Sequence, residues 1–164
     1  MLRRCGILFL CIVCLICSSC GGQRRSEELL SSLLEVSGEL PEGEIYRSEA
    51  EVGGEGYLPP TVREVLYGAE AEELFSLLEN YAIYVSSFAS PCEIGVFVAR
   101  SASDAPRIAA MCLERRDTVS VLLRQMGMGD RMEAIRIVHK GKTVIMGLTD
   151  KPDAFERAAL RLAR

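Results

Sequence analysis

The sequence has few of the residues and motifs that enzymes and metal proteins use. It has one histidine, His139, and no serine or cysteine stands in a recognisable pattern with a base. Gly127-x-Gly129 lacks the third glycine of a dinucleotide fingerprint, and Gly141-Lys142-Thr143 lacks the upstream glycine of a phosphate loop. A zinc site of His139, Cys92 and Cys112 has no ligand spacing behind it. The sequence therefore predicts no catalytic centre, no metal and no cofactor.

Basic residues are also scarce relative to acidic ones. The whole chain has 19 Lys and Arg against 23 Asp and Glu. If an N-terminal leader containing Arg3 and Arg4 is removed, 17 basic residues remain and the net charge becomes −6. Nucleic-acid binding needs clustered Lys and Arg, and adhesion to anionic lipid by charge alone needs a basic surface. The charge balance argues against both.

The longest apolar run is too short for a typical membrane span but suits a secretory signal. Arg3 and Arg4 precede the run from Cys5 to Ile16, and Cys17-Ser18-Ser19-Cys20 closes it. A positive head, an apolar stretch and small residues form a signal peptide, whereas a spanning helix needs about 20 apolar residues. A cysteine directly after two small residues is typical of bacterial lipoproteins. We therefore expect residues 1–19 to be removed, Cys20 to be acylated, and the protein to be anchored by lipid to the outer face of the bacterial cell membrane. An uncleaved anchor is the alternative.

Cysteines are sparse once this leader is set aside. The four cysteines from Cys11 to Cys20 are spaced three apart, but apolar residues separate them and no proline follows, so they do not match an iron–sulfur loop. Cys92 and Cys112 remain in the rest of the chain. Two cysteines do not make a disulfide framework in a domain of this size. They can bond to each other or remain thiols.

Hydrophobic periodicity predicts an α+β protein. We expect a four-stranded, mainly antiparallel sheet made of two hairpins, with helices packed on one face and the order α-α-ββ-α-ββ-α. The helices are expected over 26–37, 58–67, 69–80, 103–126 and 151–164, and the strands over 81–87, 92–100, 134–139 and 142–149. Both faces of the 92–100 strand are apolar, so it should be central. The Gly- and Glu-rich segment 39–57 reads as a solvated acidic loop with room for one edge strand.

These patterns divide the chain into four segments. One globular domain plus a tether suits the length that remains after the leader. The expected segments are 1–19, the lipoprotein signal peptide; 20–25, the tether; 26–58, an N-terminal helix and the acidic loop; and 59–164, the globular α+β domain.

The predicted 103–126 helix has a charged residue within its apolar stripe. Arg115 falls seven residues after Ile108 and four before Val119, with Arg116 at the edge of the stripe. A guanidinium in a core must find an acceptor or reach solvent, and Glu93 on the preceding strand is the nearest candidate acceptor. One interpretation is an arginine that binds an anion or ligand. The other, which we favour, is a structural ion pair of Glu93 with Arg115 or Arg116.

Several short motifs together resemble the domain of unknown function family 4358 (DUF4358). They are Leu66-Tyr67-Gly68, Tyr81-Ala82-Ile83-Tyr84, Cys92-Glu93-Ile94-Gly95-Val96-Phe97, Arg115-Arg116-Asp117 and Gly141-Lys142-Thr143-Val144. The resemblance covers roughly residues 59–149, and Glu93, Arg116 and Gly141 match the family's acidic residue, helix arginine and hairpin glycine. The chain has Met126-Gly127-Met128 where the family usually has an aromatic residue. The resemblance implies a small lipoprotein of Gram-positive bacteria, and it implies no activity.

Together these observations favour a membrane-tethered, extracytoplasmic lipoprotein that acts as a non-catalytic binding or interaction module for an unidentified protein or ligand. The alternative is a thiol-dependent accessory protein or enzyme that uses Cys92 or Cys112. A transport receptor is less favoured, because such receptors normally close two lobes around a ligand and this chain has room for one.

Overall fold

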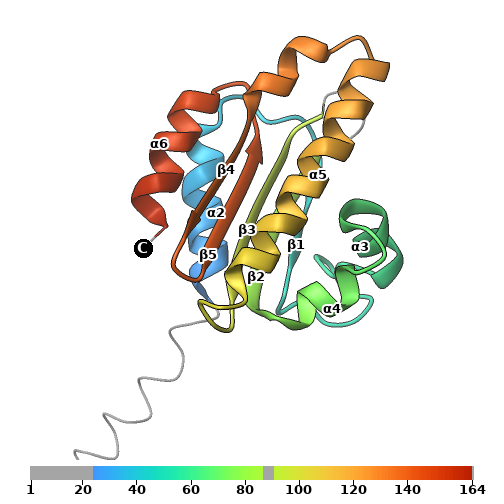
Figure 1. Ribbon diagram of the computed structural model, residues 1–164, viewed down its shortest axis with the longest axis vertical. Coiled ribbons are helices and arrows are strands. Elements are labelled where there is room, and N and C mark those ends of the chain that lie inside the picture. The colour runs from blue at the N-terminus through green and yellow to red at the C-terminus, as the bar shows by residue number, and fades with distance from the viewer. Residues whose placement is uncertain (1–23, 87–90, 164) are drawn as a thin grey trace, which may run out of the picture.

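The computed structural model describes residues 24–86 and 91–163 (Figure 1). The helices are α2 (Arg24–Val36), α3 (Pro60–Tyr67), α4 (Ala71–Ser76), α5 (Ala105–Gln125) and α6 (Pro152–Leu162), with a 3-10 helix η1 (Gly129–Ala134). The strands are β1 (Gly43–Arg47), β2 (Leu78–Ser86), β3 (Glu93–Ala99), β4 (Ile135–Lys140) and β5 (Thr143–Leu148). The fold is α+β, as the sequence predicts.

The strands form one antiparallel sheet in the order β1-β2-β3-β5-β4. The two predicted hairpins are present as β2–β3 and β4–β5, and β3 is central. The prediction of four strands is wrong, because β1 adds a fifth at the edge next to β2. This strand is the short apolar part of the acidic segment, where Ile45 pairs with Tyr84 and Tyr46 with Ile83.

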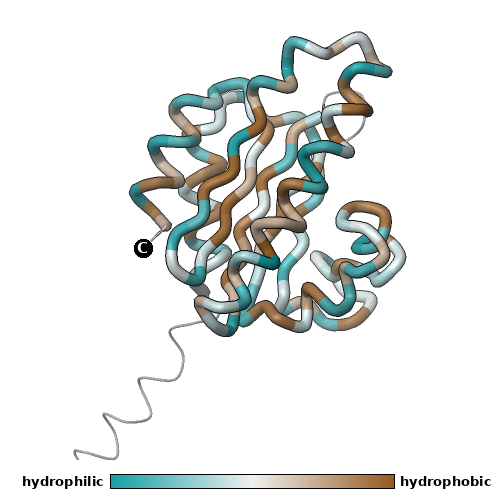
Figure 2. Tube along the Cα trace, viewed as in Figure 1, coloured by the Kyte–Doolittle hydropathy of each residue, from teal (hydrophilic) through white to brown (hydrophobic). Residues whose placement is uncertain are grey.

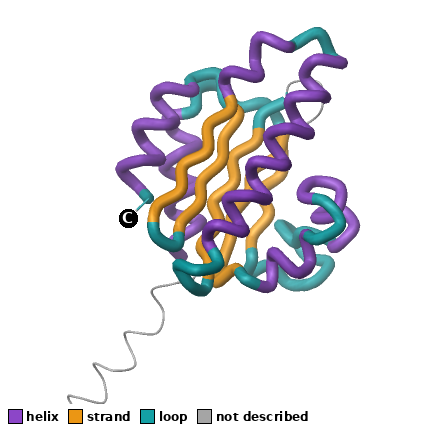
Figure 3. Tube along the Cα trace, in the orientation of Figure 1, coloured by secondary structure: helices purple, strands orange, loops and turns teal. Residues whose placement is uncertain are grey.

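Helices cover both faces of the sheet, so the prediction that they pack on one face is wrong (Figures 1 and 3). Side chains of β3 alternate between two cores, with Phe97 and Ala99 in one and Ile94 and Val96 in the other. The first core is closed by α3, α4 and α5, and the second by α2 and α6. Hydrophobic residues accordingly follow the strands between the two helical layers (Figure 2).

The predicted order of elements also needs correction. The observed order is α-β-α-α-β-β-α, then η1, β4, β5 and α6. The helix expected over 69–80 ends at Ser76, and β2 begins at Leu78. Leu78 and Asn80 are both buried and pair with Ala99 and Val98 of β3, so pairing with the sheet overrides the helical periodicity there.

The N-terminal segment belongs to the same fold as the rest of the chain. Helix α2 packs on β2 and β3, and β1 extends the sheet, so residues 26–58 and 59–163 share their cores. Helix α2 begins at Arg24, within the expected tether 20–25. The predicted signal peptide 1–19 and Cys20 lie outside the described residues.

Candidate functional site

A groove of about 610 Å³ lies on one face of the sheet, between α3 and α5. Its floor is formed by the first residues of β1 and β3, the last residues of β2, and the end of β5. Lining residues are Glu42, Gly43, Glu44, Tyr46, Thr61, Val62, Val65, Leu66, Val85, Ser86, Pro91, Cys92, Glu93, Arg115, Val119, Leu122 and Leu148.

The walls of the groove are mostly apolar. Helix α3 contributes Val62, Val65 and Leu66, which are spaced three and four apart and therefore share one face. Helix α5 contributes Val119 and Leu122 at the same kind of spacing. Val65 is 74% exposed, although it is a large apolar side chain. The groove therefore offers apolar surface to a bound group.

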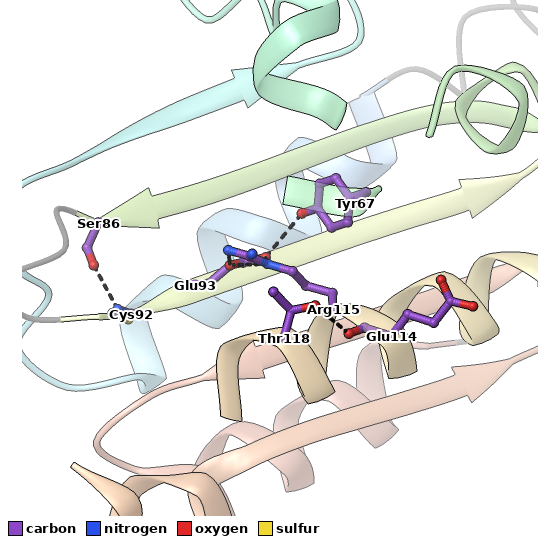
Figure 4. Close-up of polar contacts among 7 residues, drawn as sticks. All are labelled: Tyr67, Ser86, Cys92, Glu93, Glu114, Arg115 and Thr118. Atoms are coloured by element: carbon purple, nitrogen blue, oxygen red, sulfur yellow. Dashed lines mark hydrogen bonds and ion pairs between the residues drawn. The ribbon is translucent and has the colours of Figure 1, made fainter. Parts of the chain in front are cut away.

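A buried ion pair forms the polar part of the floor (Figure 4). Arg115 donates from Nη2 to Glu93 Oε2 at 2.6 Å, and from Nε to both carboxylate oxygens at 3.0 and 3.2 Å. The side chains are only 11% and 5% exposed. Tyr67 donates its hydroxyl to Glu93 Oε1 at 3.2 Å. Strand β3, helix α5 and helix α3 are thus joined through one carboxylate.

Burial and the neighbouring charges determine the protonation states of Arg115 and Tyr67. Burial lowers the pKa of Arg115, but the adjacent Glu93 carboxylate outweighs it and raises that pKa above its ordinary value. Burial, followed by the charge of Glu93, raises the pKa of Tyr67 well above its usual range. Arg115 is therefore cationic and Tyr67 a neutral donor at physiological pH.

Carboxylates stand at the mouth of the groove. Glu42 and Glu44 are exposed residues just before and within β1. Tyr46 donates its hydroxyl to Glu44 Oε2 at 2.5 Å, and burial together with Glu44 raises the pKa of Tyr46 to about 12. Within residues 24–86 and 91–163, neither Glu42 nor Glu44 pairs with a cation. The sequence predicts a solvated loop for these two residues, and only the pairing of β1 with β2 brings them to the groove.

Cys92 and Cys112 are both buried and are not joined by a disulfide. Cys92 lines the groove, and its backbone N–H donates to Ser86 Oγ at 2.7 Å (Figure 4). Burial raises the pKa of the Cys92 thiol to about 11, and burial raises the pKa of Cys112 as well. A nucleophilic cysteine needs a lowered pKa and access to its substrate, so this arrangement does not suit thiol chemistry.

The other candidate residues lie apart from the groove. Arg116 forms a surface ion pair with its neighbour Asp117, with 2.8 Å between Nη2 and Oδ1, and does not pair with Glu93. His139 is an exposed residue of β4, and Gly141 makes the β4–β5 turn with a φ of +59°. In the part of the chain that the structure describes, no three His, Cys, Asp or Glu side chains come together as metal ligands.

Comparisons with protein-family models, with curated proteins and with solved structures found no match to this chain. Among the described helices, none is both long and apolar enough to cross a membrane.

Proposed function

We propose that this chain is a membrane-tethered, extracytoplasmic lipoprotein that works as a non-catalytic binding module, with the groove between α3 and α5 as its binding site. The observation that carries this proposal is an apolar groove built over a buried Arg115–Glu93 pair. The tether and location rest on the signal-like residues 1–19 and on Cys20. The resemblance to DUF4358 remains a prediction and is consistent with that location.

The size and lining of the groove suit a ligand. Small-molecule sites typically have volumes of about 300–1,000 Å³, apolar walls and a few polar groups that orient the bound molecule. This groove has about 610 Å³, apolar walls on two helices, and polar groups from Glu93, Arg115 and Ser86.

The ion pair holds the groove open before any ligand arrives. Arg115 ties α5 to β3, and Tyr67 ties the end of α3 to the same carboxylate. A site whose walls are already fixed loses less conformational entropy on binding. A structural role for Glu93 and Arg115 is therefore compatible with a binding role for the groove that they support.

The binding hypothesis can be tested with a neutral apolar probe. The full chain, in phosphatidylcholine nanodiscs and with labelled Val and Leu methyl groups, is titrated with 1-hexanol and followed by NMR. We expect saturable shifts at Val62, Val119, Leu122 and Leu148, and no saturable shift at Leu160, an exposed residue of α6 on the other face.

Two variants make this test specific. Val65→Trp places a large side chain at the groove mouth and should abolish the saturable shifts. Leu113→Trp changes an exposed residue of α5 that does not line the groove, so it should bind as the unaltered chain does. Equal binding by both variants, or no saturable shift in the unaltered chain, would contradict the proposal.

A further inference from the structure

We infer that the ligand of this groove is a small amphiphilic cation, in which an apolar body carries one amine or guanidinium group. This inference rests on the proposed function, because it names the ligand of that same site. It follows from the charges that line the groove, taken together with its apolar walls.

Among the residues that the structure describes, the charged ones lining the groove are three carboxylates and one guanidinium, namely Glu42, Glu44, Glu93 and Arg115. Arg115 and Glu93 neutralise each other through three hydrogen bonds. Within the described part of the chain, Glu42 and Glu44 then give the groove two negative charges that no ion pair compensates. The nearest cation along the strand, Arg47, contacts Glu27 of α2 at 3.9 Å and does not line the groove.

The positions of these charges match the shape of an amphiphile. The buried pair lies at the floor beside apolar walls, whereas Glu42 and Glu44 are exposed at the mouth. An apolar body can enter between Val62 and Leu122 while its cationic group stays at the mouth, partly hydrated. Tyr46 occupies one carboxylate oxygen of Glu44, which leaves the other to accept from the ligand.

An anionic ligand fits this arrangement poorly. Its charged group would approach Arg115 beside Glu93, so two carboxylates would share one guanidinium at a site with little water. Like charges this close repel strongly in a poorly solvated environment. At the mouth the same ligand would meet Glu42 and Glu44.

The test compares three probes that share a hexyl chain: hexylammonium, 1-hexanol and hexanoate. Each is titrated at pH 7 into the full chain in phosphatidylcholine nanodiscs, and the dissociation constant is read from the groove methyl groups. We expect hexylammonium to bind roughly tenfold more tightly than hexanoate, with 1-hexanol between them, because each exposed carboxylate contributes a few-fold. Added salt should narrow the difference between the dissociation constants of hexylammonium and hexanoate.

Matched variants assign the preference to particular residues. The double variant Glu42→Gln, Glu44→Gln keeps the shape of the mouth and should bind the three probes with nearly equal affinity. Glu49→Gln, Glu51→Gln removes two carboxylates of the same acidic segment that do not line the groove, and should keep the preference. All four positions are exposed, so neither variant should disturb folding.

The outcomes separate the two proposals. If none of the probes moves the groove methyl groups, the groove is not a binding site and both proposals fail. If the probes bind equally, or hexanoate binds best, the groove binds ligands but the inference of a cation is overturned. A preference for hexylammonium that survives Glu42→Gln, Glu44→Gln also overturns it, because the selectivity then comes from elsewhere.

Discussion

Arg115 makes three hydrogen bonds to one buried carboxylate, and Tyr67 makes a fourth contact to it. Removing one member of such a buried pair costs more than removing both, because the partner left behind is charged and desolvated. The side chain of Glu93 is 5% exposed and cannot turn to water without moving β3. Removing Arg115 alone should therefore destabilise the protein more than replacing Glu93 and Arg115 together.

We predict that Arg115→Ala lowers the free energy of unfolding by about 3–5 kcal/mol, because it leaves Glu93 with only the Tyr67 hydroxyl. Chemical denaturation of the full chain in nanodiscs measures the change. The double variant Glu93→Gln, Arg115→Met should lose much less stability, because it buries no charge and retains an acceptor for the Tyr67 hydroxyl. Arg116→Ala, at an exposed pair, should change stability by no more than about 0.5 kcal/mol. An Arg115→Ala chain of unchanged stability would show that the ion pair is not structural.

The raised pKa values of Cys92 and Cys112 predict a loss of stability at alkaline pH. Burial raises the pKa of Cys92 from 9.0 to about 11 and also raises that of Cys112, so the folded state favours the protonated thiol. Their contribution is complete below pH 9 and declines as the pH rises, because the unfolded chain then ionises first. Between pH 9 and 10 we expect a loss of about 1 kcal/mol per thiol.

Denaturation at pH 8, 9 and 10 tests this dependence. Cys92→Ala should remove about 1 kcal/mol of the loss between pH 9 and 10, whatever it does to stability at pH 8. The tyrosines with raised pKa values contribute mainly above that interval, since an ordinary tyrosine titrates near pH 10. A stability that stays level from pH 9 to 10 would mean that the thiols are accessible in the folded chain.

At the scale of elements, the contact between β5 and α6 depends on a glycine. A Cβ atom at Gly147 would lie 2.2 Å from Cζ and 2.5 Å from Cε1 of Phe155, a fully buried residue of α6. The tip of the Phe155 ring can approach the sheet this closely only because position 147 has no side chain. This contact helps to fix α6 against the face opposite the groove.

We predict that Gly147→Ala destabilises the protein by about 1–3 kcal/mol, as expected when a well-packed core receives an extra methyl group. Gly129→Ala is the matched control, because a Cβ there would meet only Arg124 Cγ at 4.0 Å. Urea denaturation compares the two. Adding Phe155→Leu to Gly147→Ala should recover part of the loss, and a double variant whose two effects simply add would contradict the steric explanation.

The sequence predicted most elements of the fold because their periodicity and boundaries are local features. The β4–β5 hairpin and α5 follow directly from the alternation around Lys140-Gly141 and from the stripe that contains Ile108 and Val119. Which face each helix covers is a long-range property. The two apolar faces of β3 were visible in the sequence, and they required helices on both sides of the sheet. The prediction of helices on one face is therefore incompatible with the two apolar faces of this central strand.

The candidate site was predictable only in part, for a related reason. Arg115 stood out because a charge interrupts an apolar stripe, and Glu93 was the acidic residue on the neighbouring strand. The groove itself depends on β1 pairing with β2, which brings Glu42 and Glu44 beside Val62 and Leu122. Five residues of strand in an acidic, Gly-rich segment give little local signal for such pairing.

At the scale of the whole molecule, the groove and the start of the described chain lie at opposite ends of the sheet. Glu27, in the first turn of α2, contacts Arg47 at the end of β1, whereas the groove begins at Gly43, at the start of that strand. Helix α2 also covers the face opposite the groove (Figure 1). Three residues separate Cys20 from Arg24, a reach of at most about 14 Å when extended. A lipid at Cys20 would therefore hold the α2 end of the domain near the bilayer.

Acylation of Cys20 tests the tether and the location in the proposed function. We predict that the protein recovered from the membrane fraction of its host has the mass of a chain beginning at Cys20 plus attached acyl groups, measured by intact mass spectrometry. Cys20→Ala should lose the acyl mass, because the thiol that carries the lipid is gone. Cys14→Ala changes a cysteine inside the apolar run and should be processed normally. A chain that still begins at Met1 would instead identify residues 1–20 as an uncleaved anchor. The domain would then not be held close to the membrane by a lipid on Cys20.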